Sequence, residues 1–222
     1  PAILHDETLA RWQEHVGRVH AYRCAYILRI GHAHSPSFSL TTTATRRIVR
    51  RFVDMARRAR ETGADGIEID GDRGSLVAQV LGPGTDDSPG FIRSAFESRA
   101  DFLRELVQVV RHTVGGDFHV QLRLGGPGGR DMMVASMLQV IRWLEADGID
   151  AIHLASGGGI PGIRPRPARA VSIGRLVRSA VRIPVLRNDL FPTTAAILAA
   201  INDASCDAVS LEQPGLQLKQ AG

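Results

Sequence analysis

A repeated order of helix, glycine turn and short apolar strand is the feature that most constrains what this chain can fold into. Two segments show it most clearly, ETGADGIEID at 61–70 and EADGIDAIHLA at 145–155. Each ends in an apolar run that is too short for a buried helix and long enough for a buried strand. The same pattern predicts strands at 24–30, 65–70, 118–124, 150–155, 183–187 and 206–211.

Amphipathic segments alternate with these strands and predict helices at 6–21, 46–61, 95–112, 131–146, 172–181 and 193–203. Apolar strands that alternate with helices indicate a parallel sheet covered by helices. The candidate folds are a (β/α)8 TIM-type barrel and a doubly wound open sheet. The chain has no GxGxxG after its first strand and no P-loop, which weakens the second candidate. We expect one α/β domain over residues 1–222.

Composition argues against several classes of function. The formal net charge is +4, and the basic residues are almost all arginine. They are spread over many helices with few aromatics among them, so we expect no nucleic-acid partner. The arginines of 46–61 are interpreted as a solvated helix face. No apolar run is long enough to span a membrane and no leader is visible, so we expect a cytoplasmic protein without a membrane partner.

The two cysteines, Cys24 and Cys206, each lie in an apolar stretch. Two isolated cysteines make neither a disulfide framework nor a metal-ligand spacing. We interpret both as reduced core residues, and we expect no metal site.

Two longer segments, FVDMARRARETGADGIEIDGDRGSLVAQVLGP and FESRADFLRELVQVVRHTVGGDFHVQLRL, carry a more specific pattern. They resemble the old yellow enzyme family of FMN-dependent oxidoreductases. That family has a helix ending in AGFDGVEIH, a Leu-x-x-Gln-Phe-Leu-x-Pro run, a Glu-Asn-Arg-x-Arg-Phe motif and a strand ending Val-Arg-Leu. The matching residues are Gly74, Leu76, Gln79, Leu81, Pro83, Glu97, Arg99, Phe102 and Arg123.

The resemblance implies a (β/α)8 barrel, of which this chain covers about strands three to eight. AYILRIGHAH (25–34) is similar to the family's third strand and places His32 at its histidine. A six-stranded arc exposes two apolar edges, which proteins avoid. We therefore expect the remaining strands to come from sequence outside this chain or from a partner, as a homo- or hetero-oligomer that closes the barrel.

The resemblance fails where the family binds its substrate. Its substrate pair, His with His or Asn, is replaced by Asp70 and Arg73, and its tyrosine by Ser75. A carboxylate donates a hydrogen bond only when protonated, whereas a guanidinium always can. Asp70, Arg73 and His32 are the candidate catalytic residues.

The flavin positions are altered as well. By resemblance, Arg29 replaces the glutamine at the flavin edge, and Arg123 keeps the arginine that faces flavin N1 and O2. The phosphate-binding glycines after the seventh strand become Asn188 and Asp189, and a Gly-Arg after the eighth becomes Glu-Gln. Carboxylates there repel a phosphate. FMN is therefore implied by the resemblance alone, and the alternative is that the protein binds no cofactor. The candidate cofactor-binding residues are Arg29, Arg123, Arg187 and Asn188.

Alternation along a strand predicts that Glu68 and Asp70 point inward, between Arg29 and Arg123. One interpretation is a charge-compensated ionic core. The other is an acid/base or anion-binding pocket at the carboxyl ends of the strands, in which His32 and His153 line the wall instead of serving as core histidines. That pocket would be lined by His32, Asp70, Asp72, Arg73, His153 and Arg187. The Gly- and Pro-rich loops at 82–90 and 157–167 suit substrate covers or plain connectors.

Three functions follow from these patterns. The first is an enzyme of old yellow enzyme descent that uses FMN to reduce activated alkenes, a class of small-molecule substrate. The second is a flavin-independent barrel enzyme for isomerisation, elimination or cyclisation, with Asp70 as base and Arg73 or Arg123 holding an anion. The third is a non-catalytic barrel subunit that pairs with a partner chain.

Overall fold

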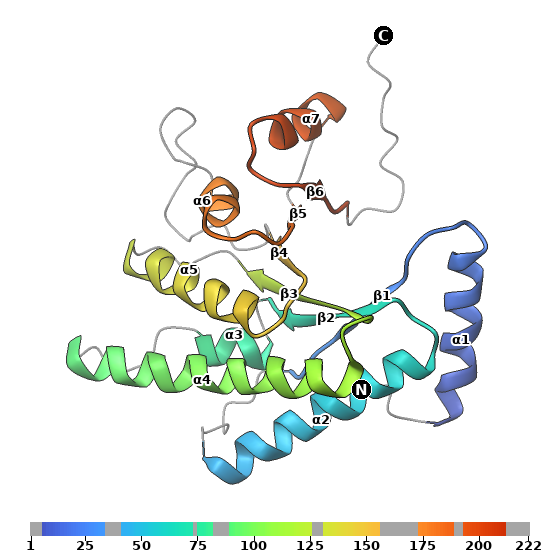
Figure 1. Cartoon of the computed structure of the whole chain (residues 1–222), viewed down its shortest axis with the longest axis horizontal. Helices are drawn as coiled ribbons and strands as arrows, with labels where there is room; N and C mark the ends of the chain where they lie inside the picture. Colours follow the sequence, from blue (N-terminus) through green and yellow to red (C-terminus); the bar gives the residue numbers. More distant parts are fainter. Residues whose placement is uncertain are drawn as a thin grey trace. The chain divides into compact units, whose positions relative to one another are not determined.

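The computed structural model describes residues 6–33, 41–72, 75–81, 89–125, 131–155, 173–188 and 193–211 (Figure 1). The chain divides into two compact units. Unit 1 comprises Pro1–Leu122 with Asp147–Ile149, and unit 2 comprises Arg123–Ala146 with Asp150–Gly222. The prediction of one domain stays a prediction.

Unit 1 consists of parallel strands covered by helices. Its strands lie in the order β1-β2-β3, and β1 pairs with β2 in parallel from Ile27 opposite Gly66 to Ile30 opposite Ile69. Its elements are α1 (Asp6–His20), β1 (Ile27–Ile30), α2 (Thr42–Glu61), β2 (Gly66–Gly71), α3 (Leu76–Leu81), α4 (Pro89–Val114) and most of β3 (His119–Gly125).

The core of unit 1 follows from the helical period of α2 and the alternation of β2. In α2 the residues Phe52, Met55, Ala56 and Ala59 recur at helical spacing, and all four are fully buried. Helices α2 and α4 pack against each other beside the strands. Thr41 caps α2 by accepting a hydrogen bond from the Ala44 N–H at 3.3 Å, which explains why the helix starts at Thr42 and not at the predicted residue 46.

Asp65 ties α1 to the start of β1. Its Oδ2 accepts the Tyr26 N–H at 2.6 Å and lies 2.8 Å from His20 Nε2 at the end of α1. The Tyr26 N–H and, next, the His20 imidazole lower the pKa of the Asp65 carboxyl. One carboxylate therefore connects three segments at the amino-terminal end of the strands.

We expect Asp65→Asn to cost about 1 kcal/mol of unfolding free energy at pH 7, a value kept small because the carboxylate is partly exposed. The pKa of Asp65 is lower in the folded state than in the unfolded state, so its contribution is complete above the ordinary pKa of about 3.9. The contribution is lost as the pH falls through the lower, folded pKa. Urea unfolding at pH 7, 4.5 and 3 should show that the difference in unfolding free energy between the parent and Asp65→Asn becomes smaller at the lowest pH. The exposed control Asp54→Asn should change the unfolding free energy little at any of these pH values. A deficit that is constant with pH would contradict this role.

Unit 2 continues the same alternation. Strand β4 pairs with β5 in parallel from Ile152 opposite Val185 to Ala155 opposite Asn188, and β5 pairs with β6. Besides the end of β3, its elements are α5 (Asp131–Ala146), β4 (Ala151–Ala155), α6 (Ile173–Ala180), β5 (Val185–Asn188), α7 (Thr194–Asn202) and β6 (Ala208–Val209).

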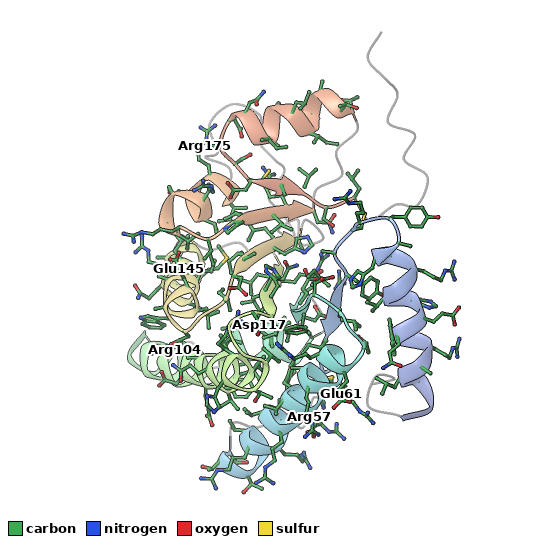
Figure 2. The ribbon with its side chains drawn as sticks, turned by 45° about the vertical axis from the view of Figure 1, so that its right-hand side comes forward. Arg57, Glu61, Arg104, Asp117, Glu145 and Arg175 are labelled. Carbon is green, nitrogen blue, oxygen red and sulfur yellow. The ribbon has the colours of Figure 1, made fainter. Side chains whose placement is uncertain are left out.

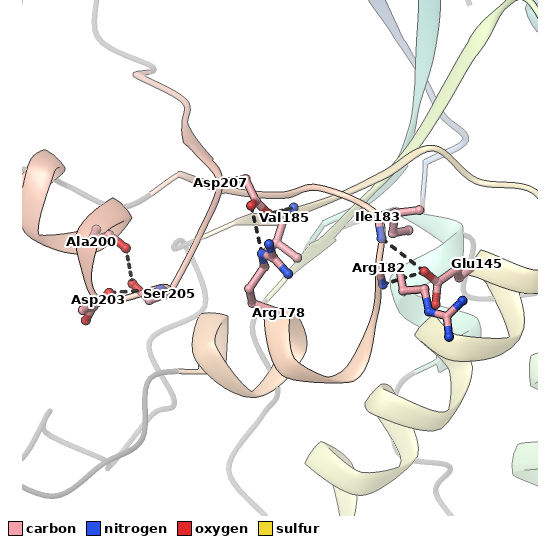
Figure 3. A network of polar contacts seen from close by, with 9 residues as sticks. All are labelled: Glu145, Arg178, Arg182, Ile183, Val185, Ala200, Asp203, Ser205 and Asp207. Carbon is pink, nitrogen blue, oxygen red and sulfur yellow. Dashed lines mark hydrogen bonds and ion pairs between the residues drawn. The ribbon is translucent and has the colours of Figure 1, made fainter.

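Carboxylates hold the amino-terminal end of β5 in place (Figure 3). Glu145 accepts the backbone N–H groups of Arg182 and Ile183 at 2.6 and 3.1 Å. Asp207 accepts the Val185 N–H at 2.8 Å through one oxygen and Arg178 Nε at 2.8 Å through the other. These contacts fix the position of the chain where β5 begins, and none of them involves the carboxyl end of the strand.

Several sequence predictions need correction. Strand β1 begins at Ile27 instead of 24, and β6 has only two residues. The short helix α3 was not predicted, because its six residues are fewer than two helical turns and show no clear period. Helix α4 begins at Pro89, inside the predicted 82–90 loop. Cys24 is exposed, whereas Cys206 is buried as predicted.

Cys24 lies in a surface groove of about 450 Å³ at the amino-terminal end of β1, lined by His15, Arg18, Val19, Tyr22, Cys24 and Tyr26. Barrel enzymes place their chemistry at the opposite, carboxyl ends of the strands. Among the residues that the structure describes, no helix is both long and apolar enough to cross a membrane.

Candidate functional site

In unit 1, a polar chain runs across three strands. Glu68 on β2 is 5% exposed, and its two oxygens accept Arg29 Nε at 2.9 Å and Gln121 Nε2 at 2.6 Å. Gln121 Oε1 in turn lies 2.9 Å from His119 Nε2. The predicted Arg29–Glu68 pair is therefore present, although the Arg29 side chain is 48% exposed. A buried carboxylate between two donors fixes both of them in orientation.

Gln121 was missed in the sequence, yet a signal was available. It stands two residues before Arg123 on β3, so alternation puts it on the same side of that strand. Its amide supplies the second donor that the buried Glu68 requires.

Asp70 ends β2 and is half-buried. Its Oδ1 accepts the Asp72 N–H at 3.0 Å, which is a local turn contact. A side chain at Gly31 would place its Cβ 2.9 Å from the Asp70 Cβ, so only glycine fits beside Asp70 on the neighbouring strand. Among the described residues no ion pair to Asp70 is found, contrary to an ionic core that includes it. Its carboxylate is an acceptor at the carboxyl end of β2.

His32 lies just beyond β1, and its contacts define its tautomer. Nδ1 lies 2.9 Å from the Ala33 carbonyl oxygen, which only accepts, so this nitrogen carries the proton. Nε2 lies 3.1 Å from Arg51 Nη1, which only donates, so this nitrogen presents its lone pair. His32 is therefore a neutral imidazole whose Nε2 already accepts a hydrogen bond.

Ser75, at the position of the family's tyrosine, has a structural use here. It is buried, and its Oγ accepts the Ala78 N–H at 3.0 Å, as an N-cap of α3 does. Arg73 and the 157–167 loop lie outside the described residues, as do 82–88 of the predicted 82–90 loop.

In unit 2, Arg123 on β3 and His153 on β4 are both buried and lie against each other. Arg123 Nη1 is 3.3 Å from His153 Nε2 and 3.4 Å from His153 Nδ1. A guanidinium only donates, so Arg123 is the donor of this contact and the imidazole is its acceptor.

Arg187 and Asn188 end β5 and differ in surroundings. Arg187 Nη1 donates to Ser205 Oγ at 2.9 Å, and its Cδ lies 2.8 Å from where a Cβ on Gly174 would be. These contacts join β5 to α6 and to the turn after α7, so any role of Arg187 toward a cofactor stays a prediction. Asn188 is 5% exposed, and its amide has no hydrogen-bond partner among the described residues. A buried amide in that state is suited to a ligand.

Comparison with known proteins identifies the family. The model described as the NADH:flavin oxidoreductase / NADH oxidase family matches residues 33–174, well over half of the chain. The chain belongs to this family. It is 28% identical over 158 residues to the NADH oxidase of Thermoanaerobacter brockii, covering 66% of this chain and 24% of that protein. It is 26% identical over 176 residues to the NADPH dehydrogenase of Clostridium acetobutylicum, covering 78% and 52%.

Solved structures confirm the fold of this flavin oxidoreductase family member. Morphinone reductase in complex with tetrahydroNAD matches with a TM-score of 0.74 and 20% identity, over 94% of this chain and 67% of that one. The predicted old yellow enzyme barrel is therefore confirmed as the fold, and the chain covers part of it. It spans about a quarter to about half of the length of the two curated relatives above.

The residues of unit 2 fit the family's cofactor in part. Arg123 provides a buried cation, which suits an electron-rich flavin edge, and Asn188 provides a buried amide at the strand end that the resemblance assigns to the phosphate. Arg29 departs from the family, because it brings a charge in place of an amide and is bound to Glu68. The donor set of unit 2 therefore suits FMN, and the altered position belongs to unit 1.

Proposed function

We propose that this protein is an FMN-dependent oxidoreductase that takes hydride from NAD(P)H and reduces an activated alkene. Membership of the NADH:flavin oxidoreductase family supports the class of reaction. The observation that carries the cofactor assignment is the pair of buried polar side chains at the carboxyl ends of two strands of unit 2, Arg123 and Asn188. A buried amide such as that of Asn188 is retained where a ligand completes its contacts.

When bound, FMN supplies the hydride-transfer chemistry of such an enzyme. Arg123 would hold the flavin, and its charge would stabilise negative charge on the reduced ring. His153 accepts a hydrogen bond from the guanidinium, which fixes its direction before the cofactor arrives. Asn188 would donate to a phosphate oxygen through its amide nitrogen.

The substrate side differs from the family. Asp70 presents a carboxylate acceptor at the carboxyl end of β2, whereas Ala33 and Arg51 already engage the two ring nitrogens of His32. Such a site binds a substrate that donates hydrogen bonds, and it polarises a bare carbonyl poorly. Arg73 is the proposed donor at the second position of the substrate pair. We therefore expect a substrate that carries both a donor group and the activating carbonyl.

Visible absorbance tests the cofactor directly. We expect protein expressed and purified with added FMN to be yellow, with bands in the blue and near-ultraviolet that remain after desalting. Titration of the colourless form should quench flavin fluorescence with one FMN per chain. Protein that stays colourless and quenches nothing would refute the proposal and favour the flavin-independent or the non-catalytic alternative. Asp70→His with Arg73→Asn would then separate those two, because only a proton-transfer enzyme loses activity.

A further inference from the structure

Asp70, at the carboxyl end of β2, carries a negative charge that the described residues leave unbalanced. Its Oδ1 accepts the Asp72 N–H at 3.0 Å, and within the described part of the chain its carboxylate has no ion pair. Glu68, two residues earlier on the same side of β2, differs because Arg29 Nε donates to it at 2.9 Å. Two carboxylates therefore stand on one side of the strand, and of these two only the buried Glu68 has a cation beside it.

Arg51 of α2 reaches the same end of the strands but does not supply this charge. Its Nη1 lies 3.1 Å from Nε2 of His32, and that nitrogen presents a lone pair, so the guanidinium donates to the imidazole. The contact joins a cation to a neutral acceptor just beyond β1. The charge of Asp70 is therefore not compensated by Arg51.

Gly31 determines what lies beside the Asp70 carboxylate on the neighbouring strand. A Cβ at Gly31 would lie 2.9 Å from the Asp70 Cβ and 3.4 Å from its Oδ2. With glycine at this position, β1 places no side chain against Oδ2. The Asp70 side chain is half-buried, so it is partly removed from water, and its attraction to an opposite charge is stronger than in bulk water.

We infer that Asp70 binds a protonated amine of the substrate, so that the activated alkene reduced by this protein is a cationic one. This inference rests on the proposed function, which brings the substrate to the carboxyl ends of the strands. A carboxylate accepts from any donor, but an ammonium adds the attraction between opposite charges to the hydrogen bond. The substrate class is therefore an unsaturated carbonyl compound that carries a basic nitrogen.

A pair of small probes tests this charge without any need for flavin. Protonated N-methylpiperidine and cyclohexanol have rings of the same size and one hydrogen-bond donor each, and they differ in charge. Amide NMR spectra of the purified chain, recorded during titration with each probe, give the affinities through the signals of Gly31 and Gly71. We expect the cation to bind about fivefold tighter than the alcohol at low salt, and this preference should shrink as salt rises.

The variant Asp70→Asn should bind both probes equally. Asparagine keeps the size of the side chain and an oxygen for the Asp72 N–H but lacks the charge, so the thermal melt should match the parent's. If the variant does not fold, the preference of the parent and its salt dependence decide. Equal affinity of the parent for both probes, or a preference that folded Asp70→Asn keeps, would overturn the inference.

Asp54→Asn is the matched control. It removes an exposed carboxylate of the same unit, one that pairs with Arg57 on α2 (Figure 2). The control should keep the parent's preference within about twofold, because only distant, screened charge has changed. An equal loss of preference in Asp54→Asn and Asp70→Asn would assign the effect to net charge and overturn the inference.

Kinetics of the FMN-loaded protein relate the cation to the substrate. Protonated N-methylpiperidine should compete with cyclohexenone, raising its KM and leaving kcat unchanged, and binding without competition would overturn the inference. Yellow protein without a preference for the cation refutes the role of Asp70 and leaves the flavin function intact. Colourless protein that still prefers the cation refutes the flavin function and leaves Asp70 as an amine-binding group.

Discussion

Replacement of Arg123 by Met is expected to weaken FMN binding about 10- to 150-fold. A hydrogen bond to a charged group contributes about 1.5–3 kcal/mol, and each 1.4 kcal/mol is a factor of ten in affinity. Arg123 is 3% exposed and donates to the His153 imidazole, so its guanidinium is already oriented and dehydrated. Both conditions strengthen a contact to a flavin edge. Fluorescence quenching of FMN gives the affinity, and a thermal melt reports whether the variant is folded.

Two further variants keep this prediction decisive. Arg123→Lys retains the charge without the planar fork, so its affinity should fall between those of the parent and Arg123→Met. Arg182→Met removes an exposed arginine from the same unit and should bind FMN as the parent does. If Arg123→Met is folded and binds FMN within threefold of the parent, Arg123 does not contact the flavin. If it fails to fold, the lysine variant decides.

Much of the fold was predictable, because the spacing of apolar residues along the sequence indicates which positions of a helix or strand are buried. The fully buried residues of α2 recur at helical spacing, and β4 is buried at all five positions, as an apolar run between two helices indicates. The boundaries were less predictable, since they depend on single contacts. Thr41 starts α2 four residues early by capping it, and Glu145 and Asp207 determine where the chain enters β5. Nothing in local composition distinguishes those three from other polar surface residues.

The site was predictable only where one residue type implies its partner. A buried Glu68 requires a cation or a donor, and Arg29 was the evident choice by strand alternation. Its second donor, Gln121, carries no charge to balance, so a count of charges overlooked it. The resemblance placed Ser75 and Arg187 at positions that contact substrate or cofactor in the family. In this structure Ser75 caps α3, and Arg187 on β5 donates to Ser205. An alignment shows which residue occupies a given position of the family, but only the packed structure shows which groups that side chain contacts.

Glu68→Ala is expected to lower the free energy of unfolding by about 3 kcal/mol. The substitution removes the oxygens that accept Arg29 Nε and Gln121 Nε2. Hydrogen bonds to a charged group contribute more than neutral ones, and the buried Gln121 amide loses a partner with no water to replace it. The truncated side chain also leaves a cavity between strands that cannot move apart. Urea unfolding should show a lower midpoint with an unchanged slope.

Comparison with Glu68→Gln and Glu105→Ala separates the causes of this loss. Glutamine fills the space of Glu68 and accepts through one oxygen only, so one of the two donors keeps a partner and the cost should be about half. Glu105 is an exposed residue of α4 in the same unit, and its truncation should cost no more than about 0.5 kcal/mol. Costs for Glu68→Ala and Glu105→Ala that agree within 1 kcal/mol would mean that the polar chain across β1, β2 and β3 adds nothing to stability. If Glu68→Gln lowers the free energy of unfolding as much as Glu68→Ala does, the loss comes from the missing charge alone. The reason is that glutamine restores the volume of the side chain and one of the two hydrogen bonds.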